Sequence, residues 1–403
     1  MSSLGRWCMA FLLALTLSGS SALGDEAVTL ENVSDPGPNR LDEPLTAAFS
    51  LDSAVRFLDS AALTWQKDRQ CFTCHTNYAY LYARPLISSN APAHAAVRQF
   101  AEELVEKRWV EKGPRWDAEV VATAAALAFN DAATTGKLHP VTKIALERMW
   151  TVQRADGGWD WLKCGWPPME NDDDYGVALA ALAVSVAPDE YRTTEAARAG
   201  IQGIKAYLKN DPPPTLHHEA LLLWASTYGE EFLDSQQRSA VVAKLRELQR
   251  DDGGWSLATL GSWQRADKTP QQTGSDGYGT GFVVYTLRRA GVEASDPAIS
   301  RGVAWLKTHQ RLSGRWITRS LKEDSKHFIS HCGTAFAVMA IASCEPAAAT
   351  DATSCWRGNR CPLAACGKIF AICPMKLRAT RRRGETESRP CSRCRFPRVA
   401  QRA

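Results

Sequence analysis

The chain has 403 residues, of which 45% are hydrophobic and 23% are charged, and its formal net charge is +4. Residues 345–403 contain 13 Lys and Arg against 4 Asp and Glu, a net of +9, so the rest of the chain carries −5. The basic character therefore belongs to the C-terminal stretch, and the charge of the remaining chain excludes a generally basic, nucleic-acid-binding body.

Residues 1–24 are typical of a secretory signal peptide, because Arg6 precedes an apolar run over 7–17 and small residues follow. The apolar run is too short to span a bilayer comfortably. We therefore expect an exported chain, periplasmic or extracellular, with no transmembrane helix after cleavage; a retained anchor stays open as the alternative. Residues 25–51 are polar and contain prolines, which predicts a loose lead-in.

Between residues 52 and 344 the apolar residues recur at helical spacing. Some predicted helices, such as 174–187, are apolar nearly all round, and they alternate with amphipathic ones, such as 235–250. The first kind needs burial on both sides and the second needs water on one side. We therefore predict one all-α domain over 52–344, built as an (α/α)6 toroid with two concentric rings. The predicted helices are 52–66, 74–88, 93–112, 117–131, 139–154, 174–187, 195–209, 215–228, 235–250, 278–291, 297–309 and 333–344.

One phrase returns three times in this region, with a Gln and a Trp six residues apart. Such self-similarity indicates a repeat architecture. The phrase, with the Gly-led apolar helix that follows it, resembles the QW repeats of the squalene–hopene cyclase and prenyltransferase superfamily. The resemblance implies an α/α toroid in which the Gln and Trp are structural and tie the end of an outer helix to the next inner helix. The phrases run from Gln153 to Trp159, from Gln249 to Trp255 and from Gln310 to Trp316.

A second motif, Cys71-Phe72-Thr73-Cys74-His75, has the spacing of a c-type haem attachment site. Two thioether bonds from Cys71 and Cys74 would hold the porphyrin, and His75 would bind the haem iron. Export to an extracytoplasmic compartment agrees with this assignment. Two alternatives stay open, which are a redox disulfide between Cys71 and Cys74 and a simple metal clip.

A third motif reads Asn-Asp-Asp-Asp-Tyr-Gly over residues 171–176. It is similar to the Asp-x-Asp-Asp-Thr-Ala motif of class II terpene cyclases, and the resemblance implies that Asp173 is the acid and Asp174 its partner. Crowded carboxylates cannot all ionise, so one of them can keep its proton. The motif departs from the family pattern, since Asn171 replaces the first Asp and Tyr-Gly replaces Thr-Ala. The alternative is a helix N-terminus enriched in Asp, which the helix dipole favours.

All inner helices of a toroid run in the same direction, so their N-termini should meet at one rim. His331 is then the first candidate for a sixth haem ligand and His327 the second, because the last hairpin neighbours the first. His217 and His218 would serve only if the haem reached inward. The rim is predicted to gather Cys71, Cys74, His75, Asp117, Glu119, Asp172, Asp173, Asp174, His217, His218, Glu219, Asp276, Tyr278, His327, His331 and Cys332.

Three functions follow from these patterns. The first is an exported ligand-binding or redox-linked barrel with covalent haem c at its rim, an apolar or extended small-molecule ligand in a central cavity and, with haem attached, a redox partner. The second is a class II terpene cyclase of the squalene or hopene type. The third is a non-catalytic structural scaffold.

Residues 345–403 differ in character from the preceding region. They hold six of the twelve cysteines and show no helical periodicity, so we predict a disordered, dispensable tail that is consistent with an out-of-frame end. Half a zinc site at Cys391 and Cys394 is an alternative, but no His follows them.

Overall fold

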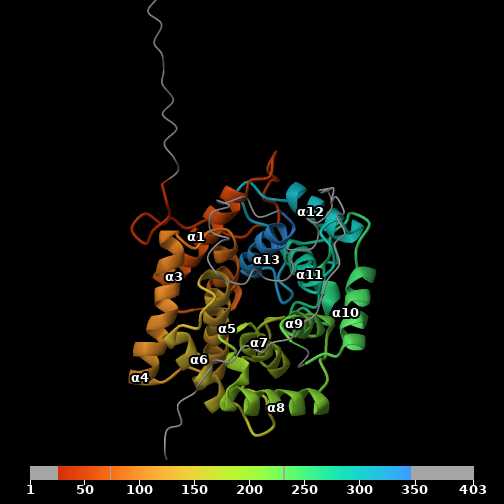
Figure 1. Ribbon diagram of the computed structural model, residues 1–403. Helices are drawn as coiled ribbons and strands as arrows, with labels where there is room; N and C mark the ends of the chain where they lie inside the picture. The colour runs from red at the N-terminus through yellow and green to blue at the C-terminus, as the bar shows by residue number, and fades with distance from the viewer. Residues whose placement is uncertain (1–25, 73, 230–231, 346–403) are drawn as a thin grey trace, which may run out of the picture. The chain divides into compact units, whose positions relative to one another are not determined.

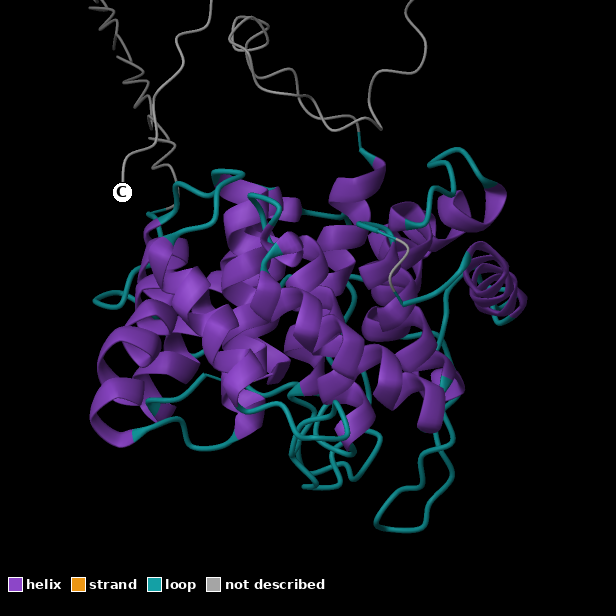
Figure 2. Cartoon of the chain, turned by 60° about the horizontal axis from the view of Figure 1, so that its bottom comes forward, coloured by secondary structure: helices purple, strands orange, loops and turns teal. Residues whose placement is uncertain are grey.

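The computed structural model describes residues 26–72, 74–229 and 232–345. The predicted signal peptide and the stretch after residue 345 lie outside the described residues. The described chain is helical, and in it β-structure is limited to two isolated bridges, Leu45 with Arg311 and Trp166 with Glu170. Figure 2 shows these helices and the long loops that gather below them in that view.

The helices form two rings, an inner and an outer one, and the outer helix of each pair precedes the inner one along the chain (Figure 1). The outer helices are α1 (Leu51–Arg69), α3 (Pro92–Glu103) with its extension α4 (Trp109–Lys112), α6 (Pro140–Thr151), α8 (Glu195–Asn210), α10 (Ser235–Glu247) and α12 (Pro297–Thr308). The inner helices are α2 (Ala79–Ala83), α5 (Asp117–Thr134), α7 (Asp173–Val186), α9 (Leu216–Ser226), α11 (Gly277–Arg289) and α13 (Ile329–Cys344).

Each inner helix packs against the next, and α13 packs against both α11 and α2, which closes the ring. Small residues let the inner backbones approach closely: a Cβ added at Gly281 of α11 would lie 2.5 Å from the backbone nitrogen of Ala337 in α13. The prediction of an all-α (α/α)6 toroid is confirmed. No helix among the described residues is long and apolar enough to cross a membrane.

The first inner helix is less regular than predicted. In place of one helix over 74–88, the chain forms a π-helical turn (Cys74–Tyr78), the short α2 and a 3-10 turn (Arg84–Leu86). Single π turns are frequent at functional sites, and this one contains the His of the CxxCH motif. The last inner helix begins at Ile329, four residues before the predicted start, so His331 and Cys332 lie in its first turn.

The three Gln side chains make one shared set of contacts. The Nε2 of Gln153, Gln249 and Gln310 donates to the carbonyl four residues ahead, at 2.9, 2.8 and 3.0 Å. It also donates to a carbonyl at the start of the next outer helix, at 3.1, 2.8 and 2.8 Å. The implied link to the next inner helix is thus wrong for the Gln, because its partner belongs to the outer ring.

The three Trp side chains are fully buried. Each indole of Trp159, Trp255 and Trp316 donates to a carbonyl ten residues back, in the last turn of its own outer helix, at 3.0, 2.7 and 2.8 Å. The backbone N–H of Trp255 and of Trp316 donates to a Thr hydroxyl of the following inner helix. The Trp residues therefore make the connection from the outer to the inner ring.

The lead-in holds a correction, because residues 36–46 are anchored to the third phrase rather than loose. The buried guanidinium of Arg315 donates to the carbonyls of residues 36–38. The N–H of Leu312 donates to the carbonyl of Pro44 over 3.0 Å. We refer to residues 36–46 as the N-terminal strap.

Aromatic side chains fill the centre of the inner ring. The indole of Trp224 in α9 makes edge-on contacts with rings from four other inner helices, at centroid distances of 5.1–6.3 Å. All five side chains are 7% exposed or less. The central cavity expected from the sequence is therefore filled at this level, and the space for a ligand lies nearer the mouth of the ring. The partners of Trp224 are Tyr82, Phe129, Tyr285 and Phe336.

Candidate functional site

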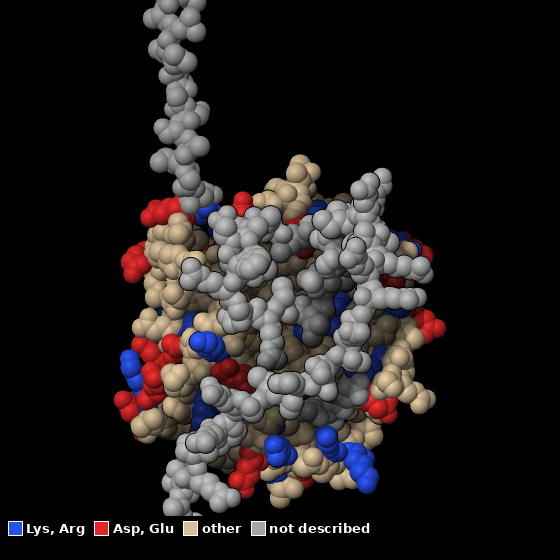
Figure 3. Space-filling view, viewed as in Figure 1, with Lys and Arg blue, Asp and Glu red and all other residues tan. Residues whose placement is uncertain are grey.

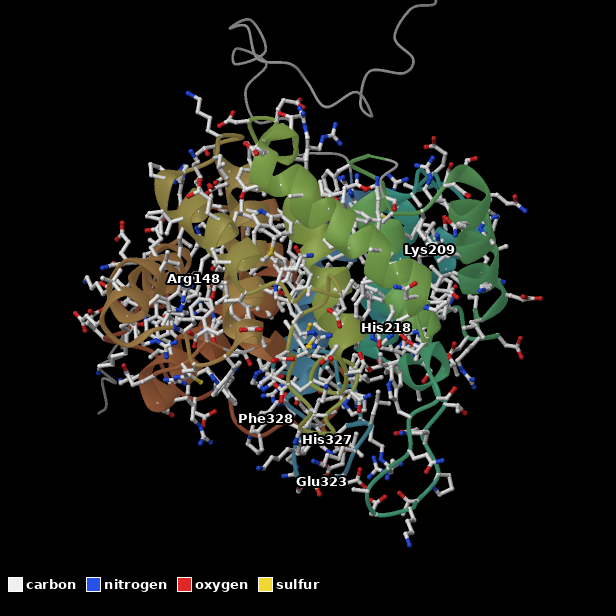
Figure 4. The ribbon with its side chains drawn as sticks, turned by 90° about the horizontal axis from the view of Figure 1, so that it is seen from below. Arg148, Lys209, His218, Glu323, His327 and Phe328 are labelled. Carbon is white, nitrogen blue, oxygen red and sulfur yellow. The ribbon has the colours of Figure 1, made fainter. Side chains whose placement is uncertain are left out.

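The N-termini of the inner helices meet at one rim, as their common direction requires. Neighbouring helix starts are joined by side-chain hydrogen bonds: His218 with Asp172 at 3.0 Å, and His217 with Tyr278 at 2.8 Å. Figure 4, seen from below, places His327 and Phe328 together at one end of the molecule. The rim therefore brings together residues from most of the repeats.

A cavity of about 220 Å³ lies at this rim. Its wall is largely aromatic and apolar, with His75, a carboxyl group and an amine among the lining side chains. Burial raises the pKa of the carboxyl, Glu170, above its usual range. The loops that cover the rim are tied together, since Lys322 lies over the Trp166 ring and donates to the carbonyl of Cys164 over 2.9 Å. The cavity is lined by Trp65, His75, Trp166, Pro167, Met169, Glu170, Ser320, Leu321, Lys326, Phe328 and Ile329.

His75 is held in one orientation by two rings and one hydroxyl. Trp65 meets it edge-on at a centroid distance of 4.9 Å, and Phe328 stacks on it at 5.7 Å. Its Nδ1 is 2.9 Å from the hydroxyl of Thr76, and its Nε2 has no hydrogen-bond partner in the described chain. Removal from water by these neighbours lowers the pKa of His75 to about 4, so the ring is neutral at physiological pH. Nε2 is thus the nitrogen that remains available to a ligand.

The two cysteines of the motif are placed unequally. Cys71 is a partly exposed free thiol whose sulfur accepts from the Trp65 indole over 3.4 Å. Cys74 begins the π-helical turn, directly before His75, and its side chain lies outside the described part of the structure. Among the residues that are described, no group of three or more His, Cys, Asp or Glu side chains is arranged to hold a metal ion.

His331, our first candidate for a sixth haem ligand, is engaged at both ring nitrogens. Its Nδ1 is 3.0 Å from the Thr76 hydroxyl, and its Nε2 is 3.1 Å from the amide nitrogen of Asn39. The Thr76 hydroxyl thus lies between His75 and His331, where iron would have to be. This arrangement is not one in which the two imidazoles share an iron. His327, the second candidate, accepts from the backbone N–H of Ser320 over 3.0 Å at Nδ1.

The Asp motif has the geometry of a helix cap rather than that of an acid catalyst. Burial alone would raise the pKa of Asp173, but ion pairs with Arg154 at 2.9 Å and Lys163 at 3.1 Å outweigh it and hold the pKa below its usual value. Burial and the charge of Asp172 raise the pKa of Asp174, which accepts from Tyr207 of α8 over 3.5 Å. Neither carboxyl group lines the rim cavity. The implied role of Asp173 as a proton donor is therefore not supported, because its ion pairs keep it ionised.

The sequence did not reveal the role of Asp172. It caps α7, accepting the Tyr175 N–H over 3.1 Å, and it also pairs with the buried His218. His218 in turn contacts the hydroxyl of Thr215 at 2.7 Å through its other nitrogen. An Asp just before a predicted helix and a His at the start of the next inner helix were visible in the sequence, but their pairing required the ring geometry.

The other rim residues mainly make local contacts. Glu119 accepts the Trp109 indole N–H over 2.8 Å, and Glu219 pairs with Lys244 at 2.8 Å. Asp276 caps α11, and burial raises its pKa to about 6. Asp117 accepts the N–H of Asp160 over 3.3 Å, whereas Cys332 is a buried free thiol.

The surface on the face seen in Figure 3 mixes both signs of charge. Where side chains are visible there, Lys and Arg are interspersed with Asp and Glu, and acidic side chains gather along the edge formed by α3 and α4. The visible face therefore does not present one continuous basic patch.

Comparison with known proteins gives one family match. Residues 223–331, from within α9 to the start of α13, match the model of the squalene-hopene cyclase C-terminal domain. No curated protein matches the chain.

Two solved structures are similar to the chain. One is ent-copalyl diphosphate synthase from Streptomyces platensis, with 18% identity and a TM-score of 0.43, covering 66% of this chain and 50% of that one. The other is a glycosyl hydrolase of family 88 from Bacteroides vulgatus, with 11% identity and a TM-score of 0.34, covering 74% and 92%. The chain thus spans half the length of the synthase. The family match and the closed ring of six helix pairs identify the chain as a squalene-cyclase-like protein of the α/α-toroid superfamily.

Proposed function

We propose that this protein is an exported squalene-cyclase-like barrel that carries covalent haem c at its rim and serves as a redox-linked or ligand-binding protein. The observation that carries the proposal is the setting of His75. Its Nδ1 is fixed by Thr76, while the ring lines a cavity among Trp65 and Phe328. A proximal haem ligand needs the same arrangement, with one nitrogen held by the protein and the other free.

The residues fit the donor set of a c-type haem. Cys71 is a free thiol with partial exposure, Cys74 precedes His75 at the start of a helical turn, and the wall around His75 is aromatic and apolar. Bound haem would supply one-electron chemistry. The cavity of about 220 Å³ is smaller than the ~300–1,000 Å³ of typical cofactor pockets. The covering residues 320–329 would therefore have to move, or the macrocycle would remain partly exposed.

Met169 replaces His331 as our candidate for the sixth ligand. It is 4% exposed and lines the same cavity as His75, and its carbonyl is held by the Trp161 indole at 2.6 Å. Met is a common partner of His in electron-transfer haem proteins, where it raises the reduction potential. Met169 carries no hydrogen-bonding duty comparable to that of His331, so its side chain is free to bind iron.

The proposal is tested by co-expressing the full-length chain with a haem-attachment system. The expected result is a pyridine haemochrome spectrum of the c type in the extracytoplasmic fraction. The spectrum should be lost when Cys71 and Cys74 are both replaced by Ser. Cys164→Ser is the matched control, because Cys164 is an exposed free thiol outside the motif and its loss should leave the spectrum unchanged. Absence of a c-type spectrum in the wild-type chain would end the proposal.

A class II terpene cyclase is the weaker hypothesis, because Asp173 is ion-paired. It predicts that the wild-type chain converts squalene to a cyclic product and that Asp173→Asn abolishes this conversion. Our proposal predicts no cyclic product from either chain.

A further inference from the structure

A chain of hydrogen bonds runs from the N-terminal strap to the rim cavity. It begins at Arg315, which donates to Oδ1 of Asn39 over 2.9 Å. The amide nitrogen of Asn39 contacts Nε2 of His331 at 3.1 Å, and Nδ1 of His331 contacts the Thr76 hydroxyl at 3.0 Å. That hydroxyl then contacts Nδ1 of His75 at 2.9 Å. Four side chains thus connect two parts of the chain that are distant in sequence.

The chemistry of the end groups gives this chain a direction. A guanidinium only donates, so Arg315 fixes the oxygen of the Asn39 amide and leaves its NH₂ group to donate to His331. Nε2 of His331 must then be the acceptor, and in a neutral ring the hydrogen is on Nδ1 and is donated to Thr76. The Thr76 hydroxyl has its own hydrogen left for Nδ1 of His75. His75 therefore carries its hydrogen on Nε2, the nitrogen without a protein partner.

The anchor of the chain is rigid. Arg315 is 2% exposed and occupies the position that is glycine in the other two phrases, Gly158 and Gly254. A Cβ at Gly158 would lie 2.7 Å from the Tyr207 ring, and one at Gly254 would lie 2.6 Å from Ser275. Only the third phrase has room for a long side chain here, and that side chain holds the strap and orients Asn39.

We propose that Asn39 is a positioning residue that decides, through His331 and Thr76, which ring nitrogen of His75 carries the hydrogen. In the haem-free protein the rim cavity is consequently offered an N–H donor by His75. Burial lowers the pKa of both His75 and His331, to about 4 and about 3, which agrees with two neutral rings.

A second consequence rests on the proposed haem function. When Nε2 of His75 binds iron, its hydrogen is on Nδ1 and is donated to Thr76, whose oxygen already accepts from His331. A hydroxyl shared by two donors is a weaker acceptor, so the His75 ring remains a modest electron donor to the metal. Partners outside the ligand set tune a bound metal in this way, and a weaker donor favours the reduced form.

Asn39→Asp reverses the chain. A carboxylate accepts both from Arg315 and from Nε2 of His331, so Nδ1 of His331 becomes the acceptor and Thr76 donates to it. The oxygen of Thr76 is then free to accept from Nδ1 of His75. The variant should therefore move the His75 hydrogen from Nε2 to Nδ1, and in the haem form it should lower the reduction potential.

The first measurement is ¹⁵N NMR of His75 in the full-length chain produced without haem attachment, with His75→Gln used to assign the signals. We expect hydrogen on Nε2 in the wild type and on Nδ1 in Asn39→Asp. Asn32→Asp is the matched control, since Asn32 bonds only to Thr29 and Ala27 in the same N-terminal region, and it should behave as the wild type does. Hydrogen on Nδ1 in the wild type, or no change in a folded Asn39→Asp, would overturn the inference.

Thr76→Val provides a second variant if Asn39→Asp fails to fold, because it removes the link without adding charge. Its His75 should lose the single preferred tautomer, and retention of the wild-type tautomer would refute the role of the chain. The second measurement is the reduction potential of the haem form, which should shift to lower values in Asn39→Asp. A wild-type chain without haem contradicts the proposed function alone, whereas a haem protein whose potential ignores Asn39→Asp contradicts this inference alone.

Discussion

Gln310 closes the ring of helices, and its removal should cost more than the removal of an equivalent Gln inside the ring. Its side chain is fully buried. It donates to the carbonyls of Ser50 and Gly314, and it accepts the N–H of Ser50 over 2.8 Å. Gln249 makes the same two donations to carbonyls, but its partner helix follows it directly in the chain.

Gln310→Ala leaves three backbone groups without a partner. Each costs about 1–3 kcal/mol when buried, and with Ser50 partly exposed we expect a loss of about 3–4 kcal/mol in the free energy of unfolding. Gln249→Ala leaves two such carbonyls and should cost about 2–3 kcal/mol on the same basis. Urea unfolding followed by circular dichroism measures both values.

Hydrogen exchange locates the effect. In Gln310→Ala, amide exchange should accelerate in residues 44–54 and 310–316, the two sides of the closure, while Gln249→Ala should leave α1 protected. The reasoning would be refuted by a smaller loss in Gln310→Ala than in Gln249→Ala, or by faster exchange that is confined to the C-terminal side.

Three further predictions follow from other contacts. Trp255→Ala should cost about 3–5 kcal/mol, measured by urea unfolding, because a fully buried indole and its bond to Leu245 are lost; a cost below about 1 kcal/mol would contradict a bracing role. The pKa of Asp173 is held below its ordinary value, so its ion pairs stabilise the fold above the unfolded pKa of about 3.9 and this contribution is lost as the pH falls through the lower folded value; Asp173→Asn should therefore destabilise at neutral pH and converge with the wild type in acid. Arg315→Gly should speed amide exchange over residues 36–39, and unchanged exchange there would show that other contacts hold the strap.

The fold could be predicted because its signal is periodic and local. Helix periodicity gave most helix boundaries to within a few residues, and three Gln and Trp phrases indicated the repeat. The largest discrepancies were at 74–88, where the chain forms a π-helical turn and a short helix, and at Ile329, where the last helix begins early. Neither position carries a phrase that fixes its boundary, so repeat analogy offered no guide there.

The rim could be predicted as a place but not as a network. Chain direction alone requires the inner helix starts to meet, so the gathering of His75, His331 and Asp172 at one end was accessible from the sequence. Which of them touch depends on side-chain packing across 255 residues in one case, Thr76 with His331. The contribution of Asn39 was hidden because the lead-in has no periodicity, and the filled centre around Trp224 was hidden because an aromatic residue on an inner helix is equally compatible with a lumen wall.

The bond between Gln310 and Ser50 also determines when the first helix can find its final neighbours during folding. These residues are 260 apart in the chain, compared with 49 for the equivalent pair Gln249 and Ala298. Closing the longer loop from an unfolded chain costs about 1.5 kcal/mol more in entropy, so repeats in the middle are favoured to pair first. The N-terminal helix α1 emerges first from the ribosome, yet it must wait for nearly the whole domain before its outer neighbour exists. An early intermediate is therefore an open arc of helix pairs with one unpaired edge at each end, and the two edges join in the last step.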